Sequence, residues 1–144
     1  MDFELNEEQR SFRDVIHRWV DAEAPKDWMR ELEADEENYP FALWDKLADA
    51  GYFGIGIDEE WGGIGGDIIM QMIFARELAR TAGGLLWVWG LTSFAGAKSV
   101  GLYGTQEQKE RWLTAMAAGK LRVSIGMTEP DGGTDVLGAM KTYA

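Results

Sequence analysis

The chain has 144 residues, a length typical of one domain, and 46% of them are apolar, which is enough for a buried core. It carries 14 basic and 25 acidic residues, a net charge of −11, which argues against nucleic acid as a partner. The absence of cysteine excludes disulfides, thiolate catalysis and cysteine zinc sites. The single histidine, His17, excludes a metal site built from two histidines.

The N-terminal segment, residues 1–6, is acidic, whereas secretory and mitochondrial leaders are basic. The most apolar stretch, Leu85–Val100, is interrupted by glycines and by Lys98. It is shorter than the run of about 20 apolar residues that a membrane-spanning helix needs. We therefore expect a cytoplasmic protein without a membrane span, in which residues 85–100 form a buried core helix.

The first third of the chain has helical periodicity. Asn6 with Gln9 three residues later predicts a helix N-terminus, and apolar residues recur at helical spacing from Phe12 to Val20. Pro25 either ends this helix or begins the next one. Residues 27–38 are acidic and mixed, which predicts a short helix or an ordered loop.

Proline, glycine and aspartate mark the boundaries of the next elements. Pro40 is expected at the first position of a helix that Gly51 ends. The glycine-rich residues 52–66 lack helical spacing, which predicts a loop. Asp67 then caps a helix that runs to Leu78.

The periodicity changes near residue 120. Thr105 with Gln108 predicts another helix start, and Gly119 predicts its end. From Leu121 to Met127 apolar residues alternate with polar or small ones, the period of a half-buried strand. We predict an all-α fold, a bundle of about five to six helices over residues 1–119, with one β-strand that opens a truncated β domain over residues 120–144.

The segment Met127–Asp135 follows this strand with a proline, paired glycines and hydroxyl residues. Such a turn exposes backbone N–H groups that can bind an anion. Gly133 permits close approach of the backbone, and Thr134 adds a hydroxyl donor. The alternative is a polar β-turn without a ligand, which is the commoner case for this local pattern alone.

Several sequence blocks in a fixed order place this turn in a wider context. They are Leu5-x-x-Glu8-Gln9, Leu47-Ala48-x-x-Gly51, Glu60-x-Gly62-Gly63, Tyr103-Gly104-Thr105, Trp112-Leu113, Ala118-Gly119-Lys120, Thr128-Glu129-Pro130-x-x-Gly133-Thr134-Asp135 and Lys141-Thr142-x-Ala144. With these blocks the chain resembles the acyl-CoA dehydrogenase family over nearly its whole length. It is similar to the N-terminal helical domain plus the start of the middle β domain.

The resemblance implies a flavoprotein that uses FAD to oxidise an acyl-CoA thioester to the trans-2-enoyl-CoA. It places the flavin ring edge at Thr128, with Ile125 and Met127 beside it. It places contacts with the pyrophosphate and the acyl-CoA at Gly133 and Thr134. The family has serine at the last position, so threonine keeps the hydroxyl but adds a stiff, branched side chain.

The resemblance also implies that the acyl chain lies along the apolar helix. There Trp87, Leu91 and Ala95 share one face at spacings of four residues and are predicted to line the substrate pocket. Ordinary helix packing explains each of the three equally well. Glu129 is interpreted as a turn residue, and the catalytic base is expected outside this chain, so that the chain alone is inactive.

For the full-length protein, the resemblance implies an electron-carrier flavoprotein as partner and a homo-oligomeric assembly. No metal site is expected. Two alternatives remain open at this point. One is a relative of the family that acts on a different substrate or electron acceptor, and the other is a helical binding module that keeps the fold without catalysis.

Overall fold

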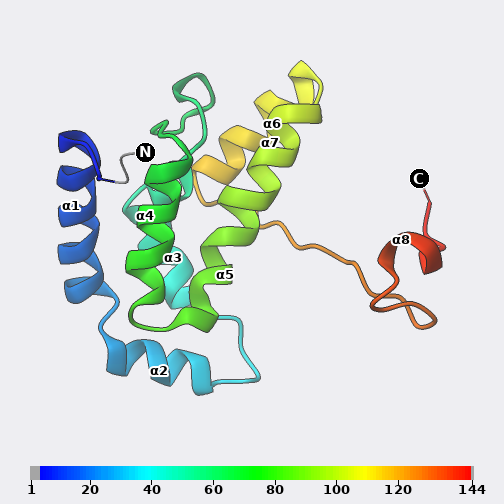
Figure 1. Cartoon of the computed structure of the whole chain (residues 1–144), viewed down its shortest axis with the longest axis horizontal. Coiled ribbons are helices and arrows are strands. Elements are labelled where there is room, and N and C mark those ends of the chain that lie inside the picture. The colour runs from blue at the N-terminus through cyan, green and yellow to red at the C-terminus, as the bar shows by residue number, and fades with distance from the viewer. Residues whose placement is uncertain (1–3, 144) are drawn as a thin grey trace.

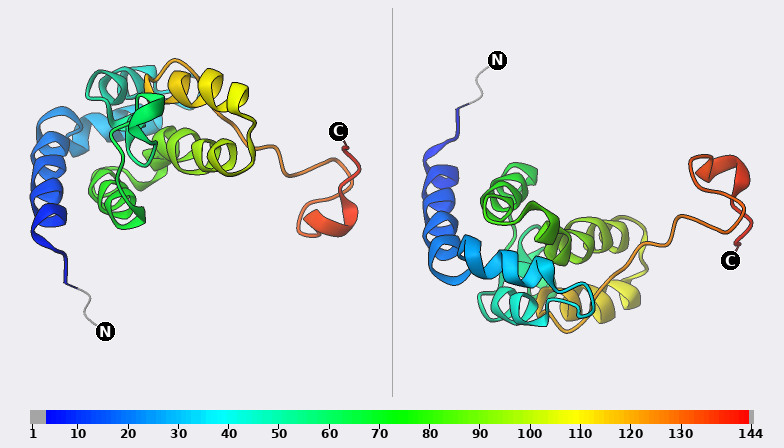
Figure 2. Two further views of the ribbon diagram at one scale, coloured as in Figure 1. Left: turned by 90° about the horizontal axis from the view of Figure 1, so that it is seen from above. Right: turned by 90° about the horizontal axis from the view of Figure 1, so that it is seen from below.

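The structure is a computed structural model that describes residues 4–143. Residues 1–3 of the acidic N-terminal segment and Ala144 of the last sequence block therefore lie outside the described residues. A helical body is followed by a C-terminal arm, residues 124–143, which extends away from it and carries the short helix α8 (Val136–Ala139) (Figures 1 and 2). The predicted helical fold class is confirmed.

The helical body is built from five separate helices and one composite rod. The rod runs without a break through α5 (Leu86–Trp89), a π-helical stretch, η4 (Gly90–Gly96), and α6 (Ala97–Tyr103). The separate helices are α1 (Glu7–Glu23), α2 (Lys26–Ala34), α3 (Phe41–Asp49), α4 (Ile68–Ala79) and α7 (Gln106–Ala117).

The helix starts follow the capping signals in the sequence. Asn6 and Gln9 form a reciprocal capping box, and Thr105 and Gln108 form a second one. The Asp67 carboxylate accepts the Met70 backbone N–H at 2.8 Å and caps α4. These three predicted boundaries are confirmed, because each cap satisfies backbone donors that the first helical turn leaves unpaired.

Two proline boundaries refine the prediction. One lies one residue away from the expected position, and the other decides between two alternatives. Pro40 is the N-cap of α3 rather than its first residue, which is Phe41. Pro25 is the N-cap of α2, so the acidic segment forms a helix over Lys26–Ala34 rather than a loop. The predicted loop 52–66 contains two short 3-10 turns, Tyr52–Gly54 and Glu59–Trp61.

The main core lies between α1, α3, α4 and the rod, with α1 packed along α4 (Figure 1). Its largest fully buried side chains are Trp89, Phe53 and Phe74. A second, smaller cluster joins α7 to the 52–66 loop and to the rod; it comprises Ile57, Trp61, Ala97, Leu113, Met116 and Ala117. The rod therefore belongs to both clusters and fixes their relative position.

The rod is buried along one face only, which corrects the prediction of a buried core helix over residues 85–100. Val88, Trp89 and Ala97 are buried, whereas the Trp87 side chain is 64% exposed. The π-helical stretch was also not predicted. No helix within residues 4–143 combines the length and the apolarity needed to cross a membrane.

The strand predicted from Leu121 to Met127 is not formed among the described residues. This segment is extended but pairs with no other strand, and the isolated bridges in residues 4–143 are Ile55 with Gly65 and Glu129 with Gly132. A strand needs a neighbouring backbone for its ladder, and this part of the chain provides none. The alternating pattern therefore does not produce a strand within the described residues.

Candidate functional site

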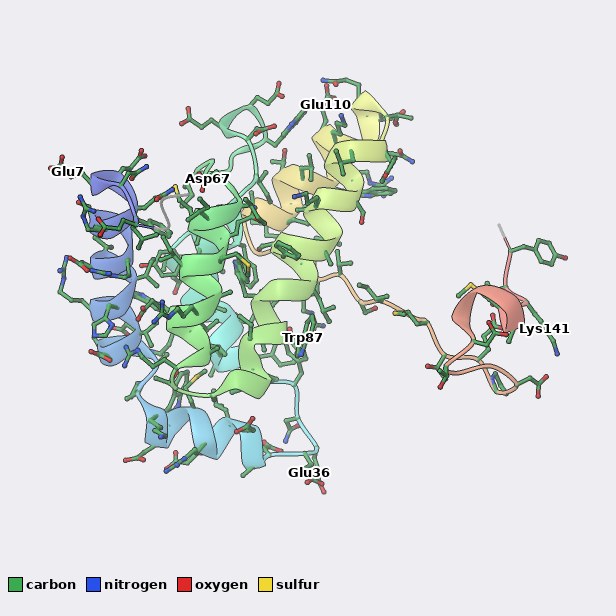
Figure 3. The ribbon with its side chains drawn as sticks, viewed as in Figure 1. Glu7, Glu36, Asp67, Trp87, Glu110 and Lys141 are labelled. Atoms are coloured by element: carbon green, nitrogen blue, oxygen red, sulfur yellow. The ribbon has the colours of Figure 1, made fainter. Side chains whose placement is uncertain are left out.

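The predicted substrate residues lie on the rod, and the predicted cofactor residues lie on the arm. In Figure 3, Trp87 marks the rod, and Lys141 marks the far part of the arm, which extends away from the helical body. Residues 122–124 connect them, because they lie against the rod next to Trp87 and lead into residues 125–128.

Trp87 and Leu91 line a pocket of about 450 Å³ together with Tyr39 of the α2–α3 connection and residues 122–124. The high exposure of Trp87 means that core packing within residues 4–143 does not explain its position on the rod. Ala95 lies one turn further along, half-buried, and does not line this pocket. The structure thus brings together two of the three predicted substrate residues.

Hydrogen bonds on the opposite face of the rod set its orientation. The Trp89 indole N–H donates to the Tyr52 carbonyl at 2.9 Å, and the buried Ser93 hydroxyl donates to the Phe53 carbonyl at 2.9 Å. Both acceptors belong to the 3-10 turn that begins the 52–66 loop. Because these bonds hold one face inward, Trp87 is left on the outer face.

The start of the extended segment is tied to the body at two points. The Trp44 indole N–H donates to the Gly119 carbonyl at 2.8 Å, where α7 has just ended. The Val123 backbone N–H donates to the hydroxyl of Thr92, a residue of the π-helical stretch that is 1% exposed, at 3.1 Å. The pocket wall formed by residues 122–124 is therefore held at Val123 and, four residues earlier, at Gly119.

Beyond that wall, the predicted cofactor residues of the arm are exposed. The side chains of Ile125 and Met127 are 53% and 54% exposed. Thr128 is exposed as well, and neither its backbone N–H nor its hydroxyl bonds to any group in residues 4–143. Met127 and Thr128 line a second pocket of about 300 Å³. The segment thus offers apolar surface and uncommitted donors to a ligand or to a further part of the protein.

Glu129 closes the arm into a loop. Its carboxylate accepts the backbone N–H groups of Lys141 and Thr142, both at 2.8 Å. The hydrogen bonds from Thr142 and Lys141 lower the pKa of the Glu129 carboxyl below its usual value. A carboxylate stabilised in its charged form and bound to backbone donors is suited to a structural role, as expected from the sequence, and not to proton abstraction.

Gly133 and Thr134 lie in the open part of this loop. Both are exposed, and no atom lies within 4 Å of the position of a side chain at Gly133. The turn before them is closed by mutual backbone bonds of 2.9 and 3.1 Å between Glu129 and Gly132. The polar turn predicted here is thus present, and its backbone is accessible to a ligand, but it lies apart from the rod pocket.

Sequence reasoning missed two residues of this region, Arg122 and Thr92. Arg122 stands at a polar position of the alternating segment, and nothing in its local pattern indicates that it reaches the rod pocket. Thr92 is one hydroxyl residue within an apolar stretch, and its bond to Val123 joins segments 31 residues apart. In the described part of the chain, no group of three or more acidic or histidine side chains is placed to hold a metal ion.

The architecture defines the class of protein. A helical domain is followed by an extended segment with strand periodicity, which forms no strand pairing within residues 4–143 and exposes the apolar side chains of Ile125 and Met127. The chain is therefore a helical domain with an extended C-terminal arm, and one pocket lies where the arm leaves the helical body.

Comparison with known proteins gives the family. Residues 6–120 match the family described as acyl-CoA dehydrogenase, N-terminal domain. The chain is 32% identical over all 144 residues to a short-chain specific acyl-CoA dehydrogenase of Clostridium acetobutylicum, of which it covers 37%. It belongs to the acyl-CoA dehydrogenase family, and it spans about a third of the length of the curated relatives that it matches.

Solved structures agree with this assignment. The chain superposes with a TM-score of 0.80 and 32% identity on a structure described for the electron transferring flavoprotein of Acidaminococcus fermentans, covering 94% of this chain and 35% of that one. It superposes with a TM-score of 0.76 and 27% identity on a glutaryl-coenzyme A dehydrogenase in complex with glutaryl-CoA, covering 97% and 35%. The helical domain is thus shared with proteins about three times as long.

Proposed function

We propose that this chain is the N-terminal part of an FAD-dependent dehydrogenase that oxidises an acyl-CoA to the trans-2-enoyl-CoA. The observation that carries the proposal is Thr128, whose backbone N–H and hydroxyl are both uncommitted on an exposed segment. That segment begins at the wall of the Trp87 and Leu91 pocket. Membership of the acyl-CoA dehydrogenase family supports FAD as the cofactor.

The residues of the arm fit one edge of a flavin. Thr128 supplies two hydrogen-bond donors, and the exposed Ile125 and Met127 supply apolar contact area. FAD, when bound, accepts the hydride that leaves the acyl β-carbon. The Thr128 donors would stabilise negative charge that develops on a flavin edge bound beside them. Gly133 and Thr134, in the open loop, would contact the pyrophosphate and the acyl-CoA.

The rod supplies the wall for the acyl chain. Trp87 and Leu91 are apolar, line one pocket and are not consumed by packing, so they can contact an acyl group. Ala95 is included because it shares this face at a spacing of four residues, although it does not line the pocket. The substrate pocket is completed by residues that this chain does not contain, since Trp87 is open on its outer side.

The remaining parts of the reaction lie outside the described residues. We place the base that removes the α-proton in a later segment, because Glu129 is committed to Lys141 and Thr142. With one edge of the cofactor site and no base, the 144-residue chain alone is expected to be inactive and to hold FAD weakly. We divide it into a helical domain, residues 1–119, and the start of the β domain, residues 120–144.

We further propose an electron-carrier flavoprotein as the redox partner of the full-length protein, and a homo-oligomeric assembly. The carrier is supported by a relative at 33% identity, the caffeyl-CoA reductase-Etf complex subunit CarC of Acetobacterium woodii. The amount of bound flavin distinguishes a dehydrogenase from a binding module without catalysis, because only the dehydrogenase requires FAD.

The test is the pair Thr128→Val and Thr128→Ser in the full-length protein. Valine keeps the shape of threonine and removes the hydroxyl, whereas serine keeps the hydroxyl. We expect Thr128→Val to weaken FAD binding or slow reduction of the bound flavin by an acyl-CoA, corresponding to about 1–3 kcal/mol, and Thr128→Ser to behave like the parent protein. Unchanged FAD affinity and unchanged reduction rate in Thr128→Val would overturn the assignment of this residue.

A further inference from the structure

The guanidinium of Arg122 lies over a group of aromatic rings at the edge of the rod pocket. Its central carbon is 4.5 Å from the centre of the Tyr39 ring, 4.7 Å from that of Phe41 and 6.0 Å from that of Trp44. Contacts of this kind with ring faces attract a cation and restrict its side chain. Arg122 is therefore held in one region although it is exposed to solvent.

The charge of Arg122 has no carboxylate partner among residues 4–143, although the chain contains 25 acidic residues. Arg13 and Arg80, by comparison, form ion pairs with Asp14 and Asp21. The aromatic rings that hold Arg122 do not neutralise it. The five N–H groups of a guanidinium also exceed what the adjacent Tyr39 hydroxyl can accept, so donors remain for a ligand.

Arg122 lines the same pocket as Trp87 and Leu91. Its backbone position is fixed, since the Trp44 indole holds the Gly119 carbonyl on one side and Thr92 holds the Val123 N–H on the other. The pocket thus combines three apolar residues on the rod, Trp87, Val88 and Leu91, with one positive charge on the facing segment. An apolar chain that ends in a single negative charge has the complementary chemistry.

We propose that Arg122 selects acyl-CoA substrates whose acyl chain carries a carboxylate at its far end; this inference rests on the function proposed above. A guanidinium binds a carboxylate through two parallel N–H···O bonds, a geometry that a lysine ammonium cannot reproduce. The single cation matches one carboxylate rather than the multiply charged phosphates of coenzyme A. Trp87 and Leu91 then contact the methylene groups between the thioester and that carboxylate.

The test compares two substrates of equal chain length in the full-length, FAD-loaded protein: a plain acyl-CoA and an acyl-CoA with a terminal carboxylate. The readout is kcat/KM for each. We expect the parent protein to prefer the carboxylate substrate. Arg122→Met keeps an unbranched side chain without the charge, and it should lower kcat/KM for the carboxylate substrate by about tenfold or more. The value for the plain acyl-CoA, which carries no charge for Arg122 to bind, should fall by less, so that the ratio of the two values drops.

Two further variants separate recognition from charge and packing. Arg122→Lys keeps the charge but loses the paired N–H bonds, so its selectivity should fall between those of the parent and Arg122→Met. Lys98→Met is the matched control, because Lys98 is a cation 5.9 Å from the centre of the Phe94 ring that does not line the rod pocket. It should leave the ratio of the two kcat/KM values unchanged.

Three results would overturn the inference. The first is a parent protein that turns over both substrates without preferring the carboxylate, a comparison that needs no variant to fold. The second is an equal loss for both substrates in Arg122→Met, which would make Arg122 a packing residue. The third is a protein whose bound flavin is reduced by none of the acyl-CoA substrates. Only this third result would also overturn the proposed function.

Discussion

Gly51 and Gly119 form a matched pair that tests how the end of α7 is held against the body. Both follow a helix and adopt a left-handed conformation, with φ of 72° and 64°. A Cβ at Gly51 would meet no atom within 4 Å. A Cβ at Gly119 would lie 2.5 Å from the Ala48 Cβ and 3.1 Å from the Phe53 ring. The two positions therefore share a backbone cost and differ in packing.

The magnitudes follow from these two terms. A left-handed alanine costs about 1–2 kcal/mol, and part of this is offset because alanine restricts the unfolded chain more than glycine does. We expect Gly51→Ala to lower the free energy of unfolding by about 1 kcal/mol. Gly119→Ala adds overpacking against Ala48 and Phe53, which costs about 1–3 kcal/mol, so its total loss should reach about 2–4 kcal/mol.

The assay is urea unfolding of the 144-residue chain, followed by tryptophan fluorescence, with the slope of unfolding free energy against urea compared among the three proteins. A difference of about 1–3 kcal/mol between the two variants at equal slopes supports the close packing of Gly119. Equal losses in both variants would refute it, and with it the fixed starting position of residues 120–123.

Three further predictions concern the rod pocket and the α1–α4 interface. Thr92→Val should lower the free energy of unfolding by about 1 kcal/mol, because the Val123 N–H loses its acceptor, while Thr92→Ser should not; urea unfolding measures both. In the full-length protein, Trp87→Ala should shift acyl-CoA preference toward longer or wider acyl groups, and a loss of stability with an unchanged substrate profile would contradict this. The hydrogen bond from Arg80 lowers the pKa of the Asp21 carboxyl below its usual value, so this group stabilises the fold at neutral pH and loses its effect as the pH falls through the lowered pKa. Thermal unfolding should therefore show Asp21→Asn less stable than the parent at neutral pH, with a gap that narrows in acid; a gap independent of pH would contradict the ion pair.

The helical body could be predicted from the sequence because its signals are local. Asn6 with Gln9, Asp67, and Thr105 with Gln108 each fix a helix start through bonds made within three residues. The strand over residues 121–127 could not form as predicted, since a strand depends on a neighbouring segment that the periodicity itself does not supply. The π-helical stretch gave no recognisable signal in an apolar, glycine-containing run.

The candidate site could be predicted only in part for the same physical reason. The exposure of Trp87 and the uncommitted donors of Thr128 agree with the predicted roles, which themselves remain predictions. Arg122 could not be found, because its contacts with Tyr39 and Phe41 join segments about 80 residues apart. Contacts between residues so far apart in the sequence depend on the fold, so no local sequence pattern predicts them.

The central claim is that this chain forms part of a flavin site that accepts electrons from an acyl-CoA. The most direct measurement is the visible absorbance of the full-length protein as isolated, recorded without oxygen before and after adding an acyl-CoA. We expect bound oxidised flavin whose absorbance is bleached by the substrate and restored by an electron acceptor. Protein that contains no flavin after reconstitution with FAD, or flavin that no acyl-CoA bleaches, would contradict the account.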